Sequence, residues 1–470
     1  MMLRVVRRAW FVGGICVLSF ASHAKSKAAE TRSDEFVQMI VKLIGDHDKE
    51  FRAAGLDQVR TAARGAAYTQ LFAAQLPKLD PAGQIALLDA LADRGDHAAR
   101  ATTFELLKSN TDENVRAAAI AALGKLGEAD DVPLLVKTLS AESGAERAAA
   151  RRSLIEIPVE TVNQTLAADL LNAAPTAHGA LIEVLATRRA RDQFPALLSA
   201  SVDENARVRR AAMGALGQLG SPEQIARMLP GVLKARKGYE RDDAEKNVAL
   251  VCARIENADQ RGDTLIEALN TVDAAQRDQL LSLVGRVGGK KLVDFVAAIA
   301  TGPDGSRRSL GIEALSKWPD ASVADKLFEI ANQTTDAAER DQAFRAYVKV
   351  AAARDGRSDK DRLARLEQGM KLAKTPEEVS LVINRVRTAY DVNSVRFVLP
   401  YVDQPQFAQI ACETIVEIAH HREVRDPNKA EVDKALDKVI ATSKDSVVVD
   451  RANRYKRGET WQRPSRRSSK

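Results

Sequence analysis

The chain has few of the side chains that catalysis and cross-linking require. Among its 470 residues there are three cysteines and six histidines, and aromatic residues make up only 4%. No G-x-S-x-G motif occurs, and neither Cys252 nor Cys412 has a histidine beside it in the sequence. Nucleophilic and acid–base catalysis therefore have no evident site, and no cofactor is expected.

Long apolar runs are also scarce, and the clearest is Ala9–Ala21 near the start of the chain. It is shorter than the roughly 20 residues that cross a bilayer, and Ser22 and Ala24 place small residues where a signal peptidase reads them. We predict that residues 1–24 are a secretory signal peptide, that 25–33 are a polar disordered leader, and that the protein is periplasmic or secreted. The alternative is an uncleaved anchor.

Most of the chain lacks an excess of charge. The net charge is +6, but residues 1–24 hold three arginines, and residues 456–470 hold six basic residues and one acid. The body between them is therefore close to neutral. Together with the scarcity of aromatics, this argues against nucleic acid as the partner. Residues 456–470 show no hydrophobic periodicity and are predicted to be a basic disordered tail.

What the chain does have is a repeated segment. Thr111–Gly127 returns almost unchanged at Asp203–Gly220, and the two copies share V-R-x-A-A-x-x-A-L-G-x-L-G. They lie 93 residues apart, which is three periods of 31. Self-similarity at such a period is typical of a solenoid, in which each repeat is one structural unit that depends on its neighbours.

Within the first copy, the small apolar residues recur at helical spacing. They form one face of a helix that Gly127 ends: Val115, Ala118, Ala119, Ala122, Leu123 and Leu126. Asp131 and Pro133 then open a second helix with its own apolar stripe, Val132, Leu135, Val136 and Leu139. Each repeat is thus predicted to be a helical hairpin, and the fold class is all-α.

The same hairpin can be followed over residues 34–455. About twelve repeats are predicted, with starts near Asp46, Asp80, Thr111, Ala141, Ala173, Asp203, Arg241, Val272, Gly302, Thr335, Thr375 and Gln404. At roughly 10 Å per helix layer, the five repeats between Cys252 and Cys412 keep these cysteines from pairing, and Cys252 is expected to be a buried small hydrophobe.

The pattern D-x-x-V-R-x-A-A-x-x-A-L-G-x-L-G with its second helix resembles HEAT repeats, especially the short bacterial form called HEAT-like or bilin-lyase-type. The resemblance is specific in the two best copies and weaker over the rest of residues 46–445. It implies a right-handed α-solenoid that binds other macromolecules along its concave face, usually without catalysis. Exported bacterial proteins with such arrays are similar.

One column of the array is especially regular. Basic or protonatable residues recur at Arg116, Arg147, His178, Arg209, Lys246, Arg277, Arg308 and Arg340, and an aspartate stands four residues earlier at Asp112, Asp242, Asp273, Asp304 and Asp336. The preferred interpretation is a structural ladder in which each cation bridges carbonyl or carboxylate groups of neighbouring repeats and fixes the stacking angle. Each aspartate caps its helix and faces the cation one turn on. The alternative is a cationic rail that attracts an anionic polymer or acidic protein.

Two further groups are candidates for binding. A basic middle section forms a candidate partner-binding patch, which comprises Arg188, Arg189, Arg191, Arg210, Lys234, Arg236 and Lys237; the bland alternative is a solvated surface. Glu413, Glu417 and His421 have a spacing that can present metal ligands from one helix, but no second helix offers a partner, so no metal site is predicted. Gly285–Lys290 is interpreted as a helix stop rather than a phosphate loop.

These observations favour a non-enzymatic exported scaffold that binds a protein through the concave face of the solenoid, and the sequence does not identify that protein. Two alternatives remain open. One is an accessory to an enzyme, or a protein like the bilin lyases, and the other is a binder of an anionic polymer through the basic middle patch and tail. Salt separates the last from the first, because contacts to phosphate weaken steeply as ionic strength rises.

Overall fold

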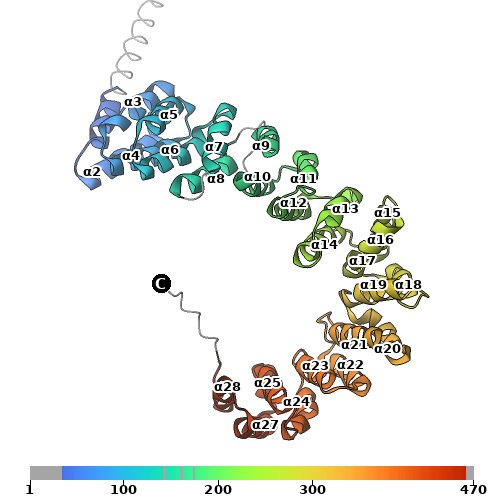
Figure 1. Ribbon diagram of the computed structural model, residues 1–470. Coiled ribbons are helices and arrows are strands. Elements are labelled where there is room, and N and C mark those ends of the chain that lie inside the picture. The colour runs from blue at the N-terminus through green and yellow to red at the C-terminus, as the bar shows by residue number, and fades with distance from the viewer. Residues whose placement is uncertain (1–33, 141–143, 159–161, 173–174, 462–470) are drawn as a thin grey trace, which may run out of the picture. The chain divides into compact units, whose positions relative to one another are not determined.

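The computed structural model describes residues 34–140, 144–158, 162–172 and 175–461. The predicted signal peptide and leader lie outside these residues, as do the repeat starts at Ala141 and Ala173 and the last nine residues of the predicted tail. Within the described ranges the chain is built of helices and turns, with no β-strand. The predicted all-α solenoid of helical hairpins is confirmed (Figure 1).

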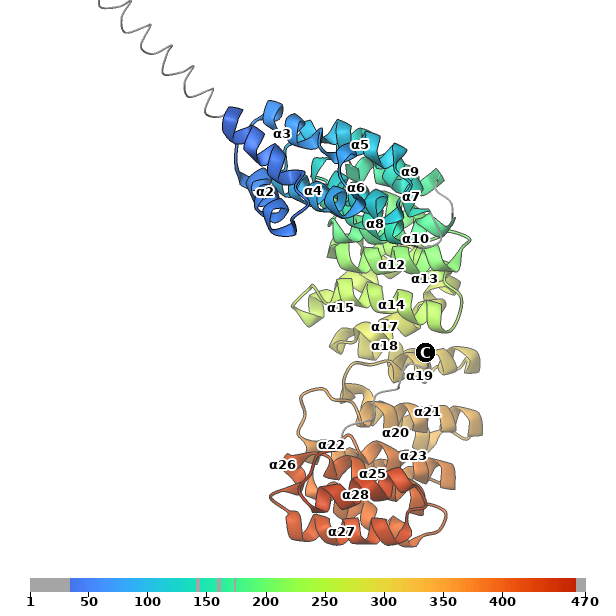
Figure 2. The ribbon, with the colours of Figure 1, turned by 90° about the vertical axis from the view of Figure 1, so that its left-hand side faces the viewer.

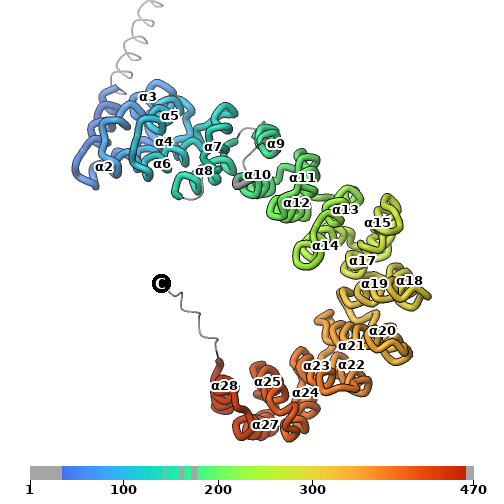
Figure 3. The backbone as a smooth tube through the Cα atoms, in the orientation of Figure 1, coloured from blue at the N-terminus to red at the C-terminus, as the bar shows by residue number. Residues whose placement is uncertain are grey.

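The hairpins fall into two compact units, Met1–Leu219 and Gly220–Lys470. In the first unit a helix over 34–44 precedes two rows of helices (Figure 3). Row A contains α2 (Lys49–Thr61), α4 (Pro81–Arg94), α6 (Glu113–Leu126), α8 (Ala145–Glu156), α10 (Pro175–Thr187) and α12 (Ala206–Leu219). Row B contains α3 (Ala66–Ala73), α5 (Arg100–Ser109), α7 (Val132–Leu139), α9 (Val162–Asn172) and α11 (Phe194–Ala200).

The second unit continues the alternation, and its helices follow one another layer by layer (Figure 2). Its row A contains α14 (Tyr239–Cys252), α16 (Ala274–Gln279) with α17 (Leu281–Val287), α19 (Gly305–Ser316), α21 (Ala337–Ala351), α23 (Pro376–Val386), α25 (Ala408–Ala419) and α28 (Ser446–Lys456). Its row B contains α13 (Ile225–Lys234), α15 (Ala258–Leu269), α18 (Lys290–Ala300), α20 (Ala324–Gln333), α22 (Asp359–Leu372), α24 (Val392–Val398) and α27 (Lys429–Thr442). A short α26 (Arg422–Arg425) lies between α25 and α27.

The predicted repeat starts fall close to the N-termini of row A helices. Asp80 and Thr375 are the N-caps of α4 and α23, and each accepts a hydrogen bond from a backbone N–H of its helix. The start predicted near Arg241 lies two residues inside α14, which begins at Tyr239. The other end of the array also shifts, since α28 takes in Lys456, the first residue of the predicted tail.

The repeated segment folds as its pattern predicts. Val115, Ala119, Ala122, Leu123 and Leu126 are buried on α6, which Gly127 ends by donating its N–H to the carbonyl of Leu123. Helix α7 then begins after Asp131 and buries all four residues of its predicted stripe. Ala118, by contrast, is only half-buried.

Small residues allow the row A helices to pack closely. A Cβ on Gly124 of α6 would lie 2.9 Å from the Cα of Ser153 on α8. A Cβ on Gly285 of α17 would lie 1.9 Å from the carbonyl oxygen of Ala314 on α19. At such distances glycine is required, because any other residue would overlap the neighbouring backbone. The glycine of the A-L-G-x-L-G pattern is therefore a packing position.

A recurring arginine, which we call the clamp arginine, ties each of several helices to the element before it. It lies in or near the first turn and donates to the carbonyl oxygen six residues earlier, at 3.0 Å from Arg52 to Asp46, 2.7 Å from Arg209 to Asp203, and 3.2 Å from Arg308 to Gly302. Arg241 does the same to Ala235 at 2.8 Å. The end of the preceding helix or its following turn thus finds donors for carbonyls that have no helical partner.

Candidate functional site

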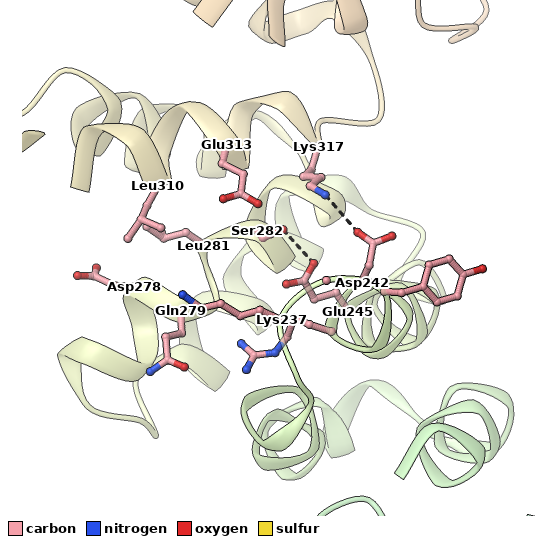
Figure 4. Close-up of a pocket in the computed structure, with 13 residues that line it drawn as sticks. Lys237, Asp242, Glu245, Asp278, Gln279, Leu281, Ser282, Leu310, Glu313 and Lys317 are labelled. Atoms are coloured by element: carbon pink, nitrogen blue, oxygen red, sulfur yellow. Dashed lines mark hydrogen bonds and ion pairs between the residues drawn. The ribbon is translucent and has the colours of Figure 1, made fainter. Parts of the chain in front are cut away.

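In the second unit, a cavity of about 440 Å³ opens between three successive row A helices, α14, α17 and α19 (Figure 4). Its lining combines acids and bases with a few apolar side chains. The polar lining includes Lys237, Asp242, Glu245, Ser282, Glu313 and Lys317. They come from three neighbouring repeats, so the stacking itself assembles the site.

A buried carboxylate forms the floor of this charge network. Glu245 on α14 is only 2% exposed, and one of its oxygens accepts hydrogen bonds from Ser282 Oγ and Arg286 Nε, both at 2.9 Å. Burial raises the pKa of Glu245 above its usual range, and the hydrogen bond from Ser282 and the charges of Lys317 and Arg241 oppose that rise. Burial also lowers the pKa of Arg286.

A second carboxylate joins the same three helices. Asp242 forms ion pairs with Arg286 and with Lys317, whose Nζ lies 3.1 Å from its Oδ1. Lys246, one turn along α14, approaches the other oxygen of Asp242 at 2.9 Å. These contacts fix the charges at the cavity wall before any ligand arrives, which lowers the entropic cost of binding.

Two charged groups face the cavity with no hydrogen-bond or ion-pair partner among the described residues. Glu313 is exposed on α19, and Lys237 is exposed in the turn before α14 (Figure 4). The site therefore offers one free carboxylate and one free ammonium beside a satisfied ion-pair network. Such a surface suits polar side chains of another protein better than an apolar ligand.

Row A of the second unit also carries a column of basic residues that the sequence analysis did not predict. The variable position of A-L-G-x-L-G is occupied in four successive row A helices of the second unit by Arg286, Lys317, Lys349 and Arg385. We call these four residues the basic stripe. The signal lies in the sequence itself, because Arg286 and Lys317 occupy the variable position of a pattern that predicts a helix stop.

Four aspartates of the predicted ladder act as N-caps, but Asp242 lies inside α14, where Gly238 is the N-cap. Oδ1 of Asp112 accepts from the N–H of Asn114 at 2.8 Å, and Asp273, Asp304 and Asp336 accept from backbone N–H groups of α16, α19 and α21 in the same way. The following repeat supplies a glutamate partner to Arg116, Arg308 and Arg340, in place of the aspartate one turn before each of them. Lys246 does pair with its own Asp242.

The cations of the ladder reach across to the next row A helix. Arg116 Nε donates to Glu146 at 2.7 Å, Arg308 Nε to Glu339 at 2.8 Å, and Arg340 Nη2 to Glu378 at 3.1 Å. Arg209 instead binds the carbonyls of Asp203 and Glu204. Arg277 is exposed and has no side-chain partner in the described residues, while Arg147 lies on α8. The column thus joins repeats at several places.

The predicted basic patch is not a single surface within one unit. Arg188, Arg189, Arg191 and Arg210 lie in the first unit, whereas Lys234, Arg236 and Lys237 lie in the second. Arg188 has a structural role, because its guanidinium donates hydrogen bonds to the backbone carbonyls of Leu154, Ile155 and Ile157 at 2.9 to 3.0 Å. The other six side chains are exposed, and only Lys237 lines the cavity.

The remaining candidate residues are buried or form contacts within the fold. Cys252 and Cys412 are free and buried, and burial raises the pKa of the first to about 12 and of the second to about 11. Glu417 pairs with Arg451 at 2.7 Å and His421 stacks on Tyr390; within the described residues no group of three potential ligands converges on a metal position. Across the same residues, no helix combines the length and the apolar character needed to cross a bilayer.

Comparison with known proteins agrees with this architecture. The family model for HEAT repeats matches residues 69–155 and 165–249. The chain contains HEAT repeats in these two regions. No curated protein sequence matches it.

Solved structures with a similar course of helices include the karyopherin Kap121p and Kap95p. A mutant of Kap121p is 12% identical, with a TM-score of 0.47, over 93% of this chain and 54% of that one. Kap95p in complex with RanGDP is 12% identical, with a TM-score of 0.42, over 90% of this chain and 65% of that one. This HEAT-repeat chain thus spans about half the length of Kap121p.

Proposed function

We propose that this HEAT-repeat protein is an exported, non-enzymatic scaffold that binds a protein partner through row A of its second unit. The cavity between α14, α17 and α19 carries the proposal. Its charged groups are positioned by contacts between repeats, and Glu313 and Lys237 remain open for a partner. A preorganised polar surface of this kind is typical of protein recognition.

The state of the titratable groups supports a binding role rather than a chemical one. Both thiols are buried with raised pKa values, so they are protonated at neutral pH and are poor nucleophiles. Glu245 is the most deeply buried acid at the cavity, and it is held by Ser282 and Arg286. Glu245 is therefore a poor general base, because proton transfer needs an accessible lone pair beside the substrate.

A site-specific photo-crosslinker tests the binding face. Tyr239, at the cavity, and Phe295, on α18 of row B, are both exposed aromatic residues, so each accepts a benzoyl-phenylalanine with little change in shape. In extract of the native envelope, we expect one protein to be crosslinked from position 239 and not from position 295. Equal labelling from both positions, or none from 239, would remove the support for row A.

Export is tested separately. The protein is isolated from the periplasmic fraction or culture medium, and its N-terminus is sequenced. We expect the mature chain to begin at Lys25, as the small residues at Ser22 and Ala24 predict. A chain recovered in the cytoplasm with residues 1–24 still attached would refute export and leave the binding role standing.

A further inference from the structure

Two residues of the basic stripe form ion pairs with described residues, and the other two do not. Arg286 and Lys317 are held by Asp242 and Glu245. Lys349 on α21 and Arg385 on α23 are exposed, and neither side chain forms a hydrogen bond or ion pair with any described residue. Two neighbouring repeats therefore present unpaired cations on the same row.

The surroundings of Lys349 are positive. Desolvation lowers its pKa first, and the nearby charges of Lys317, Arg286 and Arg385 lower it further, while only Glu313 acts in the opposite direction. Like charges held close together repel, and an anion placed among them relieves that repulsion. Among the described residues, no acid pairs with Lys349 or Arg385, so an anion from a binding partner could reduce this repulsion.

Helix capping alone does not explain the stripe. A cation near a helix C-terminus is favourable, and each of the four residues lies in or just after the last turn of its helix. In the first unit, however, the same position is occupied in three successive row A helices by Asp93, Lys125 and Glu156. The position tolerates either sign, so the four successive cations of the second unit need a further reason.

We propose that Lys349 and Arg385, with Lys317 beside them, bind an acidic segment of the protein partner. This inference rests on the proposed function and adds the chemistry of the partner to it. The carboxylates of the segment bind the two unpaired cations, and Lys317 keeps its contact with Asp242 while it adds to the positive field.

The spacing of the stripe predicts the form of the segment. Neighbouring packed helices lie about 8–10 Å apart, so cations on successive row A helices repeat at about that distance. A polyproline II segment has three residues per turn and rises about 3.1 Å per residue, so every third side chain lies on one side at intervals of about 9 Å. An acidic residue at every third position therefore matches the stripe.

The experiment measures binding of fluorescent peptides to the mature chain, residues 25–470. One peptide repeats Glu-Pro-Ala, and a second has the same composition with its glutamates contiguous. We expect the first to bind at least tenfold more tightly. Equal affinity would contradict the spacing and reduce the stripe to a diffuse positive field.

Paired charge reversals test the residues. The double variant Lys349→Glu with Arg385→Glu should bind the Glu-Pro-Ala peptide at least tenfold more weakly than the wild type does. Lys360→Glu with Lys371→Glu changes the net charge equally on α22 of row B, where both lysines are exposed, and should change affinity less than twofold. Equal loss in both doubles, or no loss in the first, would overturn the proposal.

Two controls keep the result interpretable. If the first double variant unfolds, Lys349→Gln with Arg385→Gln removes the charges without adding acids and should still weaken binding. The crosslink from position 239 is measured in the same variants. If the peptide result fails while that crosslink persists, the proposed function stands and only the acidic segment is rejected; tighter binding of polyphosphate than of the peptide would instead indicate an anionic polymer.

Discussion

The two units use one position of the same repeat in different ways. In the first unit it holds Asp93 and Lys125, whose side chains pair with one another at 2.9 Å across neighbouring repeats. In the second unit it holds the basic stripe, in which Lys349 and Arg385 have no described partner. The position accepts a charge of either sign, so helix formation alone does not decide which charge a repeat carries there.

The units also differ in regularity. Row A helices of the first unit begin at Glu113, Ala145, Pro175 and Ala206, close to the period of 31, and the family model matches mainly there. In the second unit α21 begins at Ala337 and α23 at Pro376, because longer turns intervene. The two unpaired cations, Lys349 and Arg385, lie on the two helices that this longer spacing separates.

The largest expected effect separates the two units by their stability. Leu123 on α6 and Leu315 on α19 are both fully buried. Replacing either with aspartate buries an unpaired charge and should cost about 4 kcal/mol or more. Hydrogen exchange should accelerate around α6 in Leu123→Asp and around α19 in Leu315→Asp, with the other unit protected. Loss of protection everywhere from either change would show that the units unfold as one.

The second prediction compares an inter-repeat ion pair in each unit. Glu378 is 3% exposed and accepts hydrogen bonds from Arg340 and from the N–H of Lys374, whereas Glu146, the partner of Arg116, is half-buried. Glu378→Ala should lower the free energy of unfolding by about 3 kcal/mol, and Glu146→Ala by about 1 kcal/mol. Urea unfolding checks both; equal losses would mean that burial does not set the strength of the ladder.

The same glutamate predicts a pH dependence. Burial acts to raise the pKa of Glu378, but the hydrogen bonds from Arg340 and Lys374 outweigh it, so the pKa is lowered on folding. A carboxyl with a lowered pKa stabilises the fold above its ordinary pKa and loses that contribution as the pH falls through its lowered value. The stability difference between wild type and Glu378→Gln should therefore shrink as the pH is lowered from about 6 to below about 4. A constant difference would contradict the shift.

Two glycines give opposite and smaller effects. Gly285→Ala in the second unit should cost about 2 kcal/mol, because its Cβ would overlap the carbonyl of Ala314. A Cβ added to Gly214 on α12 of the first unit would meet no neighbouring atom within 4 Å, so Gly214→Ala should raise stability by up to about 1 kcal/mol. Thermal melting distinguishes them; a loss at Gly214 would show that the helix packs more tightly there than the geometry implies.

The sequence predicts the hairpins well because their signals are local. The caps at Asp80 and Thr375, the stop at Gly127 and the stripe on α7 all depend on residues within one or two turns of each other. Periodicity then sets the number of repeats. Both kinds of signal can be identified without knowing how one helix is rotated relative to the next.

The partners of the cations could not be found in that way. Arg116 lies four residues from Asp112 in the sequence, but it binds Glu146, 30 residues on, because the rotation between α6 and α8 brings that carboxylate to the guanidinium. Local spacing therefore favours the wrong acid. The basic stripe was hidden for a related reason: its members are 31 to 36 residues apart, so a strict period of 31 does not align them.

The clamp arginine has a consequence for how such a chain can change its length. It completes the end of the preceding element while belonging to the helix that follows, as Arg209 and Arg308 do with carbonyls six residues before them. A deletion or duplication whose two ends fall at equivalent points of different repeats restores one arginine and one set of carbonyls at the new junction. A break between the arginine and the carbonyl six residues before it leaves that carbonyl without its hydrogen-bond donor. Recombination that preserves the fold therefore adds or removes whole hairpins.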